Sequence, residues 1–213
     1  MMRIENGIRN SFEQSHLKVV NFVFWALILL IIFSFGGSKS SKSEAELISH
    51  AEQSIKNIST LEAEFTQISS DGSFVIGRLY FRRPFQMRLE YNLEQPYNLI
   101  TTRKWLIIDE PLDQKITNYP ISETPLALLL EEKLSLTGDE FSTQVRNHNG
   151  LVEIVLSKKD GVRSGILTLL FEPDFKLRGW IITDAMGIVT KVTLQNEIYG
   201  RELPNKLFGW PAY

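Results

Sequence analysis

Apolar and polar side chains alternate with a period of two through much of the chain, most regularly near its middle. The apolar residues Phe85, Met87, Leu89 and Tyr91 are separated by single polar residues. Because successive side chains of a β-strand point to opposite faces of the sheet, this segment predicts a strand with one apolar and one polar face.

Ten further segments have the composition of short strands and lie between turn signals such as Asp71-Gly72 and Asn149-Gly150. They are residues 62–69, 74–82, 97–102, 105–108, 114–118, 141–147, 151–157, 165–171, 176–183 and 189–198. Short consecutive strands joined by tight turns are typical of an antiparallel meander that is curled or closed. The pattern therefore predicts an antiparallel sheet of about eleven strands.

Two segments instead repeat their apolar residues at helical spacing. Residues 44–60 predict an amphipathic helix with Ser43 as its N-cap. Residues 124–132 predict a short apolar helix inserted between two strands, with Thr124 as its cap and Pro125 at its first position.

Two helices are too few to cover both faces of so many strands. We therefore expect a mainly β fold with helices (α+β), in which a strongly curved sheet carries the helices across its open side. The concave face is then apolar and includes Met87, whose side chain adapts to irregular ligands. An ordinary packed core predicts the same apolar face, so the pattern alone leaves both interpretations open.

An apolar segment stands apart from these elements near the start of the chain. It runs from Val19 to Phe35, about 17 residues with Asn21 as a polar interruption. This length lies between a long signal-peptide core and a short membrane anchor, and the small residues Ser34 and Gly36 favour cleavage. Both outcomes export the residues that follow. We expect a signal peptide or N-terminal anchor, a flexible linker and a folded domain, at residues 1–36, 37–43 and 44–213.

Charge and cysteine content exclude several classes of function. A net charge of -2, from 23 basic and 25 acidic residues, gives no electrostatic footprint for nucleic acid. The absence of cysteine excludes disulfides, thiolate metal sites and a cysteine nucleophile.

No motif gathers residues for catalysis. The three histidines, His16, His50 and His148, lack metal-ligand spacing. The sequence contains no G-x-S-x-G elbow and no phosphate-binding glycine pattern. Acidic pairs such as Asp109-Glu110 flank turns and are more typical of solvated faces than of acid/base pairs. We therefore expect a protein that is not an enzyme and that holds neither a metal nor a cofactor.

Five motifs follow one another along the predicted domain. They are FTQ…GRLYFRRPFQMRLEY from Phe65 to Tyr91, KWLIIDEPLDQKITNYP, TPLALLL, DAMGIVTKVTLQNE, and a terminal Phe208 with Pro211. In order and spacing these motifs resemble the LolA family, the periplasmic carriers of outer-membrane lipoproteins. The resemblance covers nearly the whole chain from the first predicted helix onward.

The resemblance implies a half-open antiparallel β-barrel of eleven strands with a helical lid over a hydrophobic cavity. Such a cavity shelters the acyl chains of lipoproteins in transit from the inner to the outer membrane. The implied partners are acylated lipoproteins, an inner-membrane ABC-type lipoprotein-release complex and an outer-membrane lipoprotein receptor. The implied state is a monomer in the Gram-negative periplasm, or a carrier tethered to the inner membrane if the leader is not cleaved.

The resemblance also assigns roles to single residues. Arg83 matches the family's lid-closing arginine, which is held to bond backbone carbonyls of a lid helix that matches residues 124–130. The five donors of a guanidinium suit this role, although the position alone is typical of an exposed strand end. The residues expected to line the lipid-binding cavity are Phe65, Tyr80, Phe85, Met87, Leu89, Tyr91, Leu126, Leu129 and Leu130.

Two other functions stay open on the sequence. A periplasmic sensor or regulatory module on the same half-barrel would bind partner proteins, and a carrier of another lipid would use the same cavity. The family's outer-membrane receptor has a similar fold but is anchored by a lipidated cysteine. Because this chain has no cysteine, the soluble carrier is the better match.

Overall fold

The computed structural model describes residues 42–139, 141–159 and 165–211. The predicted leader at residues 1–36, with its apolar segment and cleavage site, and the linker up to residue 41 lie outside this range. Within the described residues no helix is both long and apolar enough to span a membrane.

The first described helix, α2, spans Glu44–Lys56 and begins where the pattern predicts. Ser43 and Glu46 form a capping box, in which the Glu46 N–H donates to Ser43 Oγ and the Ser43 N–H donates to Glu46 Oε2. The helix ends at Lys56, with Asn57 as its C-cap, before the predicted end at residue 60, because Thr60 already pairs as the first residue of a strand.

Eleven strands follow within the described residues, and the predicted number is confirmed. They are β1 (Thr60–Ser69), β2 (Phe74–Arg82), β3 (Gln86–Tyr91), β4 (Asn98–Thr101), β5 (Trp105–Glu110), β6 (Lys115–Pro120), β7 (Phe141–His148), β8 (Leu151–Lys158), β9 (Ile166–Phe171), β10 (Leu177–Thr183) and β11 (Val189–Tyr199). Every neighbouring pair is antiparallel, as the tight turn signals predicted.

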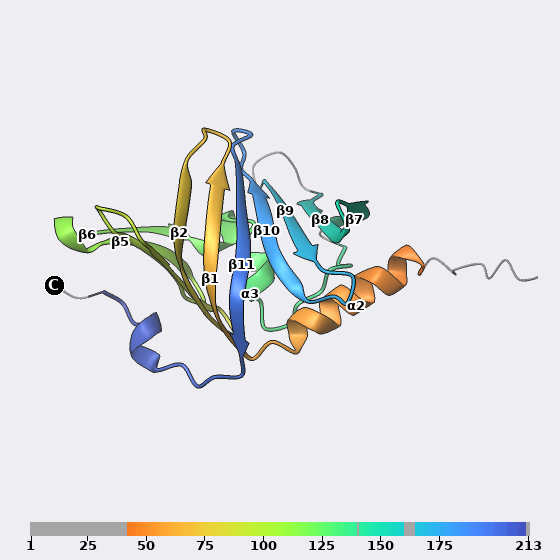
Figure 1. The fold of residues 1–213 in the computed structure, drawn as a ribbon, viewed down its shortest axis with the longest axis horizontal. Helices are drawn as coiled ribbons and strands as arrows, with labels where there is room; N and C mark the ends of the chain where they lie inside the picture. The colour runs from red at the N-terminus through yellow and green to blue at the C-terminus, as the bar shows by residue number, and fades with distance from the viewer. Residues whose placement is uncertain (1–41, 140, 160–164, 212–213) are drawn as a thin grey trace, which may run out of the picture. The chain divides into compact units, whose positions relative to one another are not determined.

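The eleven strands form one open sheet in the order β6-β5-β4-β3-β2-β1-β11-β10-β9-β8-β7 (Figure 1). Two meanders, β1 to β6 and β7 to β11, are joined by the central pairing of β1 with β11. The free edges are therefore β6 and β7, which are consecutive strands in the chain. The predicted mainly β, unclosed fold is confirmed.

The chain between β6 and β7 has to travel from one edge of the sheet to the other. It does so through a 3₁₀ turn, η2 (Ile121–Glu123), and the short helix α3 (Ala127–Leu130). Near its start Lys158 Nζ at the end of β8 donates to Ser122 O, and near its end the Phe85 N–H donates to Leu130 O. We call residues 121–132 the lid, because this segment crosses the side of the sheet that the helices cover.

The lid helix is shorter than predicted, and Thr124 does not cap it. Thr124 closes the preceding 3₁₀ turn instead: its backbone N–H and its side-chain hydroxyl both donate to Ile121 O. Its oxygen is therefore not presented to the first N–H groups of the helix, and the N-cap position falls on Leu126, without a side-chain bond.

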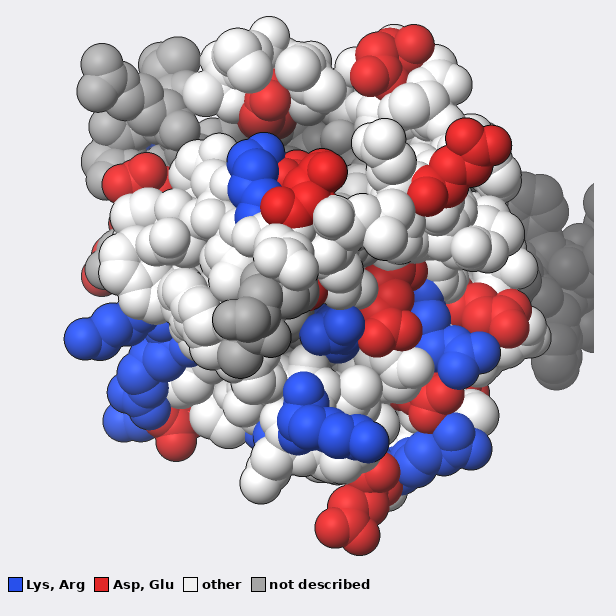
Figure 2. Space-filling view, turned by 90° about the vertical axis from the view of Figure 1, so that its left-hand side faces the viewer, with Lys and Arg blue, Asp and Glu red and all other residues white. Residues whose placement is uncertain are grey.

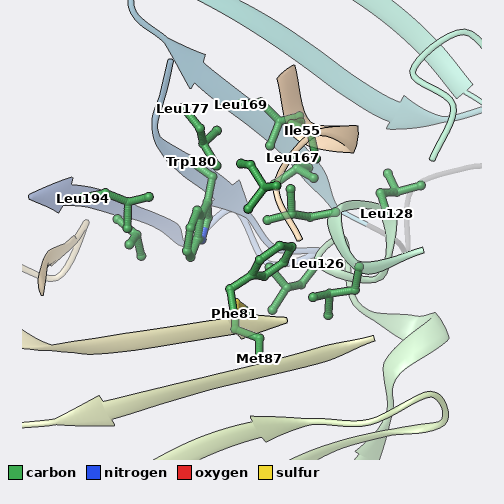
Figure 3. Close-up of a cluster of buried hydrophobic side chains, with 14 of the residues drawn as sticks. Ile55, Phe81, Met87, Leu126, Leu128, Leu167, Leu169, Leu177, Trp180 and Leu194 are labelled. Atoms are coloured by element: carbon green, nitrogen blue, oxygen red, sulfur yellow. The ribbon is translucent and has the colours of Figure 1, made fainter. Parts of the chain in front are cut away.

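The two halves of the sheet face each other across one hydrophobic cluster (Figure 3). Phe81 and Met87, from β2 and β3, point into it from one side, and Leu169 and Trp180, from β9 and β10, point into it from the other. Side chains of α2 and of the lid fill the space between them. We call the sheet face that lines this cluster the inner face.

The outer face of β2 and β3 is covered by a segment that the pattern did not predict, the C-terminal arm at residues 200–211. This arm contains η3 (Asn205–Phe208). Arg82 Nη1 donates to Leu203 O at 2.8 Å, and the Arg82 guanidinium lies 4.6 Å from the centre of the Phe208 ring. Leu203 and Phe208 are buried, so the arm adds a second, smaller packed layer to the domain.

A further 3₁₀ turn, η1 (Pro111–Asp113), joins β5 to β6.

Candidate functional site: an apolar interior beneath a lid

Four of the predicted cavity residues lie together on the inner face. Phe65 and Tyr91 both pair with Gly77, so the three share a face, and Leu89 pairs with Leu79 beside them. Met87 is fully buried, and Phe65, Leu89 and Tyr91 are buried as well. The rings of Phe65 and Tyr91 meet edge to face with their centroids 5.2 Å apart.

Gly77 makes this aromatic contact possible. A Cβ at position 77 would lie 2.5 Å from Phe65 Cζ and 2.2 Å from Glu90 O. A Cβ does not approach other atoms so closely, and the backbone oxygen cannot move away alone. The ring of Phe65 therefore occupies the space that any larger residue at position 77 would fill.

The lid supplies the opposite wall. Leu126, Leu129 and Leu130, the lid residues expected to line the cavity, are buried, and Leu128 is buried with them. The prediction missed Leu128 because it assumed one apolar face on a longer helix, whereas a single turn of helix presents all its leucines to the cluster. Burying four leucines is a large contribution for so short a segment, about 1.5–3 kcal/mol for each side chain.

The interior is packed where α2, the sheet and the lid meet. A void of about 10 Å³ remains where α2, the sheet and the lid meet. It is lined by Ile55, Ile58, Leu61, Leu79, Phe81, Leu129, Leu177 and Trp180. Such a space has room for at most a single water molecule. An extended ligand can therefore enter this space only if the elements around it move apart.

Arg83 holds the end of the lid. Its Nη1 donates to Leu129 O at 3.1 Å, and its Nη2 donates to Glu131 O and, at 3.5 Å, to Glu132 O. These carbonyls lie at the C-terminal end of α3, where helix carbonyls lack intrahelical partners and a positive charge is favourable. Partial burial lowers the pKa of Arg83, but an arginine stays charged at neutral pH.

Phe85 lies at the edge of the lid rather than within the strand alternation. It stands in the β2–β3 turn with a left-handed φ of 67°, and β3 begins one residue later at Gln86. Its N–H donates to Leu130 O at 2.9 Å, and the guanidinium of Arg103 lies 4.4 Å from its ring centre. Arg103 also approaches Glu132 at 3.8 Å. Phe85 thus helps to dock the lid, and its ring is only partly buried.

Tyr80 is a correction to the predicted cavity. It pairs with Glu62 on β1 and with Arg88 on β3, whereas the buried neighbours Leu79 and Phe81 point to the other face. Strict alternation along β2 therefore places Tyr80 on the outer face, away from the interior. The prediction for Tyr80 is wrong because it followed the family resemblance and not the period of the strand.

The second half of the sheet contributes cavity residues that were not predicted. Leu167 and Leu169 on β9, Trp180 on β10 and Leu194 on β11 point into the same cluster (Figure 3). The alternation within residues 165–171 already indicates that Leu167 and Leu169 lie on one face of a strand. What the sequence did not supply was the pairing of β1 with β11, which brings this half against the first.

A partly exposed margin continues the interior toward the β4–β6 edge. Its apolar members packed against the core include Val75, Tyr97, Leu99 and Leu106. The rings of Tyr91 and Tyr97 stack at 4.2 Å, and the Tyr91 hydroxyl donates to Gln67 Oε1 at 2.9 Å. Burial raises the pKa of Tyr91 and of Tyr97, so both phenols stay neutral at physiological pH.

Charged groups do not form a metal centre in the described residues. No group of three or more histidine, aspartate or glutamate side chains there is arranged to hold a metal ion. On the face drawn in Figure 2, acidic and basic side chains lie interspersed. Ion pairs also form between exposed or partly exposed side chains, such as Lys115 and Glu110, whose charged atoms lie 2.6 Å apart. The most distinctive feature of this part of the chain is therefore an apolar interior closed by a lid.

Comparison with known proteins shows which protein family matches this chain. The family model described as outer membrane lipoprotein carrier protein LolA matches residues 56–210. A curated outer-membrane lipoprotein carrier protein from Azotobacter vinelandii is 28% identical over 147 residues, which cover 62% of this chain and 68% of the relative.

The solved structures that match this chain are far more distant in sequence. A LolA superfamily protein from Nitrosomonas europaea matches with a TM-score of 0.46 and 10% identity, over 80% of this chain and 99% of that one. An uncharacterized conserved protein from Thermus thermophilus matches with a TM-score of 0.47 and 11% identity, over 78% and 93% of the two chains.

Proposed function

The chain belongs to the LolA family of outer membrane lipoprotein carrier proteins, which are carriers and not enzymes, and on that premise we propose how it carries its cargo. The acyl chains of a lipoprotein take the place that the lid leucines occupy in the closed interior. The observation that carries this proposal is the packed apolar interior beneath a short lid whose C-terminal end is bonded by Arg83.

The energetics of this exchange favour loading only when a lipid is present. Opening the lid alone would expose leucines such as Leu129, each worth about 1.5–3 kcal/mol of burial, together with the inner-face residues beneath them. An acyl chain covers that surface again and gains about 0.8 kcal/mol for each buried CH₂. The empty carrier therefore stays closed in water, and a long acyl chain offsets the cost of opening it.

The latch makes the closed state easy to reverse. Arg83 contacts backbone carbonyls at the end of the lid, and two of its three acceptors lie at exposed positions. Hydrogen bonds near water contribute little net free energy, because water replaces them when they break. We propose Phe65, Met87, Leu89 and Tyr91 on the sheet as acyl-chain contacts. On the lid we propose Leu126, Leu129 and Leu130, with Phe85 at the rim.

The route of the cargo is proposed from the family. The donor is an inner-membrane ABC-type lipoprotein-release complex, and the acceptor is an outer-membrane lipoprotein receptor. We place the carrier domain at residues 44–213, after a leader at 1–36 and a linker at 37–43, with the domain acting as a monomer in the periplasm. A carrier whose leader is retained would work tethered to the inner membrane.

Mass spectrometry of molecules that co-purify with the chain tests the cargo class. After expression in a Gram-negative host and purification without detergent exchange, the proposal expects acylated lipoproteins bound at one per carrier. Recovery of phospholipid or glycolipid alone would indicate a carrier of another lipid. Recovery of a partner protein without acyl chains would indicate a sensor or regulatory module.

A further inference from the structure

Thr101 is a polar side chain buried within the apolar site. It lies at the end of β4 on the inner face, where it pairs with Met87 on β3 and Leu106 on β5. Its relative exposure is 0%, and Asp109 is the only other polar or charged residue that is buried in the described chain. A polar group in such a position is expected to have a specific hydrogen-bonding task.

The Thr101 hydroxyl bonds backbone groups of the β2–β3 turn and of the strand that follows it. It donates to Phe85 O at 2.8 Å and accepts from the Met87 N–H at 2.8 Å. A hydroxyl is suited to both tasks, since it carries one donor and two acceptor lone pairs. Removing the hydroxyl would take this acceptor away from the N–H of the fully buried Met87, which is energetically costly.

These bonds hold the turn in the conformation that docks the lid. Phe85 adopts a φ of 67°, which is costly for an aromatic residue and persists only where the surroundings impose it. Thr101 holds the carbonyl of Phe85 while the N–H of the same residue donates to Leu130 O on the lid. Arg83, which donates to Leu129 O, precedes Phe85 by two residues in the same turn.

We propose that Thr101 is a positioning residue for lid closure, acting through the turn that carries Arg83 and Phe85. Its hydroxyl bonds the turn and β3 and does not bond the lid carbonyls itself. It fixes the turn so that the Arg83 donors and the Phe85 N–H face the lid together. The inference rests on the proposed function only in taking the lid as the gate of the interior.

The substitution Thr101→Val keeps the shape of the side chain and removes the hydroxyl, so the turn is no longer fixed. The measurement is amide hydrogen exchange in the purified full-length chain without cargo, read at Phe85, Leu128 and Leu129. We expect exchange at these amides to accelerate by roughly two- to tenfold, the range that corresponds to the net contribution of one hydrogen bond, here the bond from the Phe85 N–H to Leu130 O that the loosened turn no longer holds in place. Thr101→Ser, which keeps the hydroxyl, should restore exchange close to that of the unaltered chain.

Thr102→Val is the matched control. The Thr102 hydroxyl also bonds backbone groups, accepting from the Trp105 N–H at 3.0 Å, but it serves the β4–β5 turn. Its loss should leave the exchange of Leu128 and Leu129 unchanged. Equal acceleration in both variants would show a general loss of stability and would overturn the inference.

A double-mutant cycle separates positioning from a structural role. In the Arg83→Leu background most of the latch is already absent, so Thr101→Val should accelerate lid exchange by a smaller factor than it does alone. The same factor in both backgrounds would overturn the inference. If Thr101→Val does not fold, the Thr101→Ser variant provides the test. Amide exchange in its lid that is as fast as in Arg83→Leu would contradict the role of the hydroxyl. These measurements need no lipid, so their failure is distinct from failure to find acylated cargo.

Discussion

Replacing Arg83 with leucine removes the charged contacts that hold the lid and leaves the sheet intact. Arg83 Nη1 and Nη2 donate to three carbonyls, Leu129 O, Glu131 O and Glu132 O. The central pairing of β1 with β11 and the buried side chains of the inner face make no use of this guanidinium. We therefore expect Arg83→Leu to fold with an unchanged far-UV spectrum and to open its lid more often.

The magnitude follows from the exposure of the three bonds. A hydrogen bond to a charged group contributes about 1.5–3 kcal/mol when it is buried, and exposed ones contribute far less. Only the bond to Leu129 O is partly buried, and the other two lie at exposed positions. A total of about 1–3 kcal/mol is then lost from the closed lid, which corresponds to roughly 5- to 150-fold more frequent opening.

Amide exchange at Phe85 measures this opening directly, because its N–H donates to Leu130 O across the contact between the turn and the lid. Exchange at Leu128 and Leu129, whose N–H groups donate to Pro125 O and Leu126 O, reports how far the lid itself loosens once it is released. Arg82→Leu is the matched control, since the neighbouring arginine donates to Leu203 O of the C-terminal arm. Both variants lower global stability, but only Arg83→Leu should accelerate lid exchange beyond that of the sheet. Unchanged lid exchange in Arg83→Leu, or equal acceleration in Arg82→Leu, would refute the latch.

Three further predictions concern the packing and the acid stability of the domain. Gly77→Ala should lower the free energy of unfolding by about 1–3 kcal/mol in urea titrations, because its Cβ would meet Glu90 O at 2.2 Å. Gly138→Ala is the control: its Cβ would have its nearest neighbour at 3.7 Å, so the free energy of unfolding should fall much less. Met87→Ala should lower the free energy of unfolding by about 2–5 kcal/mol and leave a dry cavity. Urea denaturation measures the first effect, and xenon binding in crystals detects the second. Burial raises the pKa of Glu52, but bonds from Lys56 and the Leu136 N–H outweigh it and hold the pKa below its ordinary value. Ionised Glu52 therefore stabilises the folded domain at pH values above the ordinary glutamate pKa, and this stabilisation is lost as the pH falls through the lower pKa of the folded state. In Glu52→Gln the free energy of unfolding should depend less on pH in that acid range.

The sheet could be predicted from the sequence because its signals are local. The alternation at Met87, Leu89 and Tyr91 fixes which side chains share a face, and glycine-containing turns fix where strands end. The start of α2 was equally local, since Ser43 and Glu46 lie three residues apart. Each of these features depends on neighbours along the chain, so a single sequence suffices to find it.

The errors arose where a distant contact decides the conformation. Phe85 fits the alternation, yet its backbone is held in a turn by Thr101 and the lid. Thr124 fits a helix cap, yet its hydroxyl bonds the 3₁₀ turn before it. The C-terminal arm has no periodic signal, because its position depends on bonds from Arg82 and Arg88, more than a hundred residues away.

Photocrosslinking from the inner face tests the central claim most directly. A photoreactive amino acid at Met87 reports on the interior, and one at Tyr80, seven residues earlier on the outer face, is the control. In cells that make lipoproteins, we expect the Met87 position to trap acylated lipoproteins and the Tyr80 position to trap few or none. Equal trapping at both positions, or only phospholipid at Met87, would contradict the account of an interior that opens to shelter lipoprotein acyl chains.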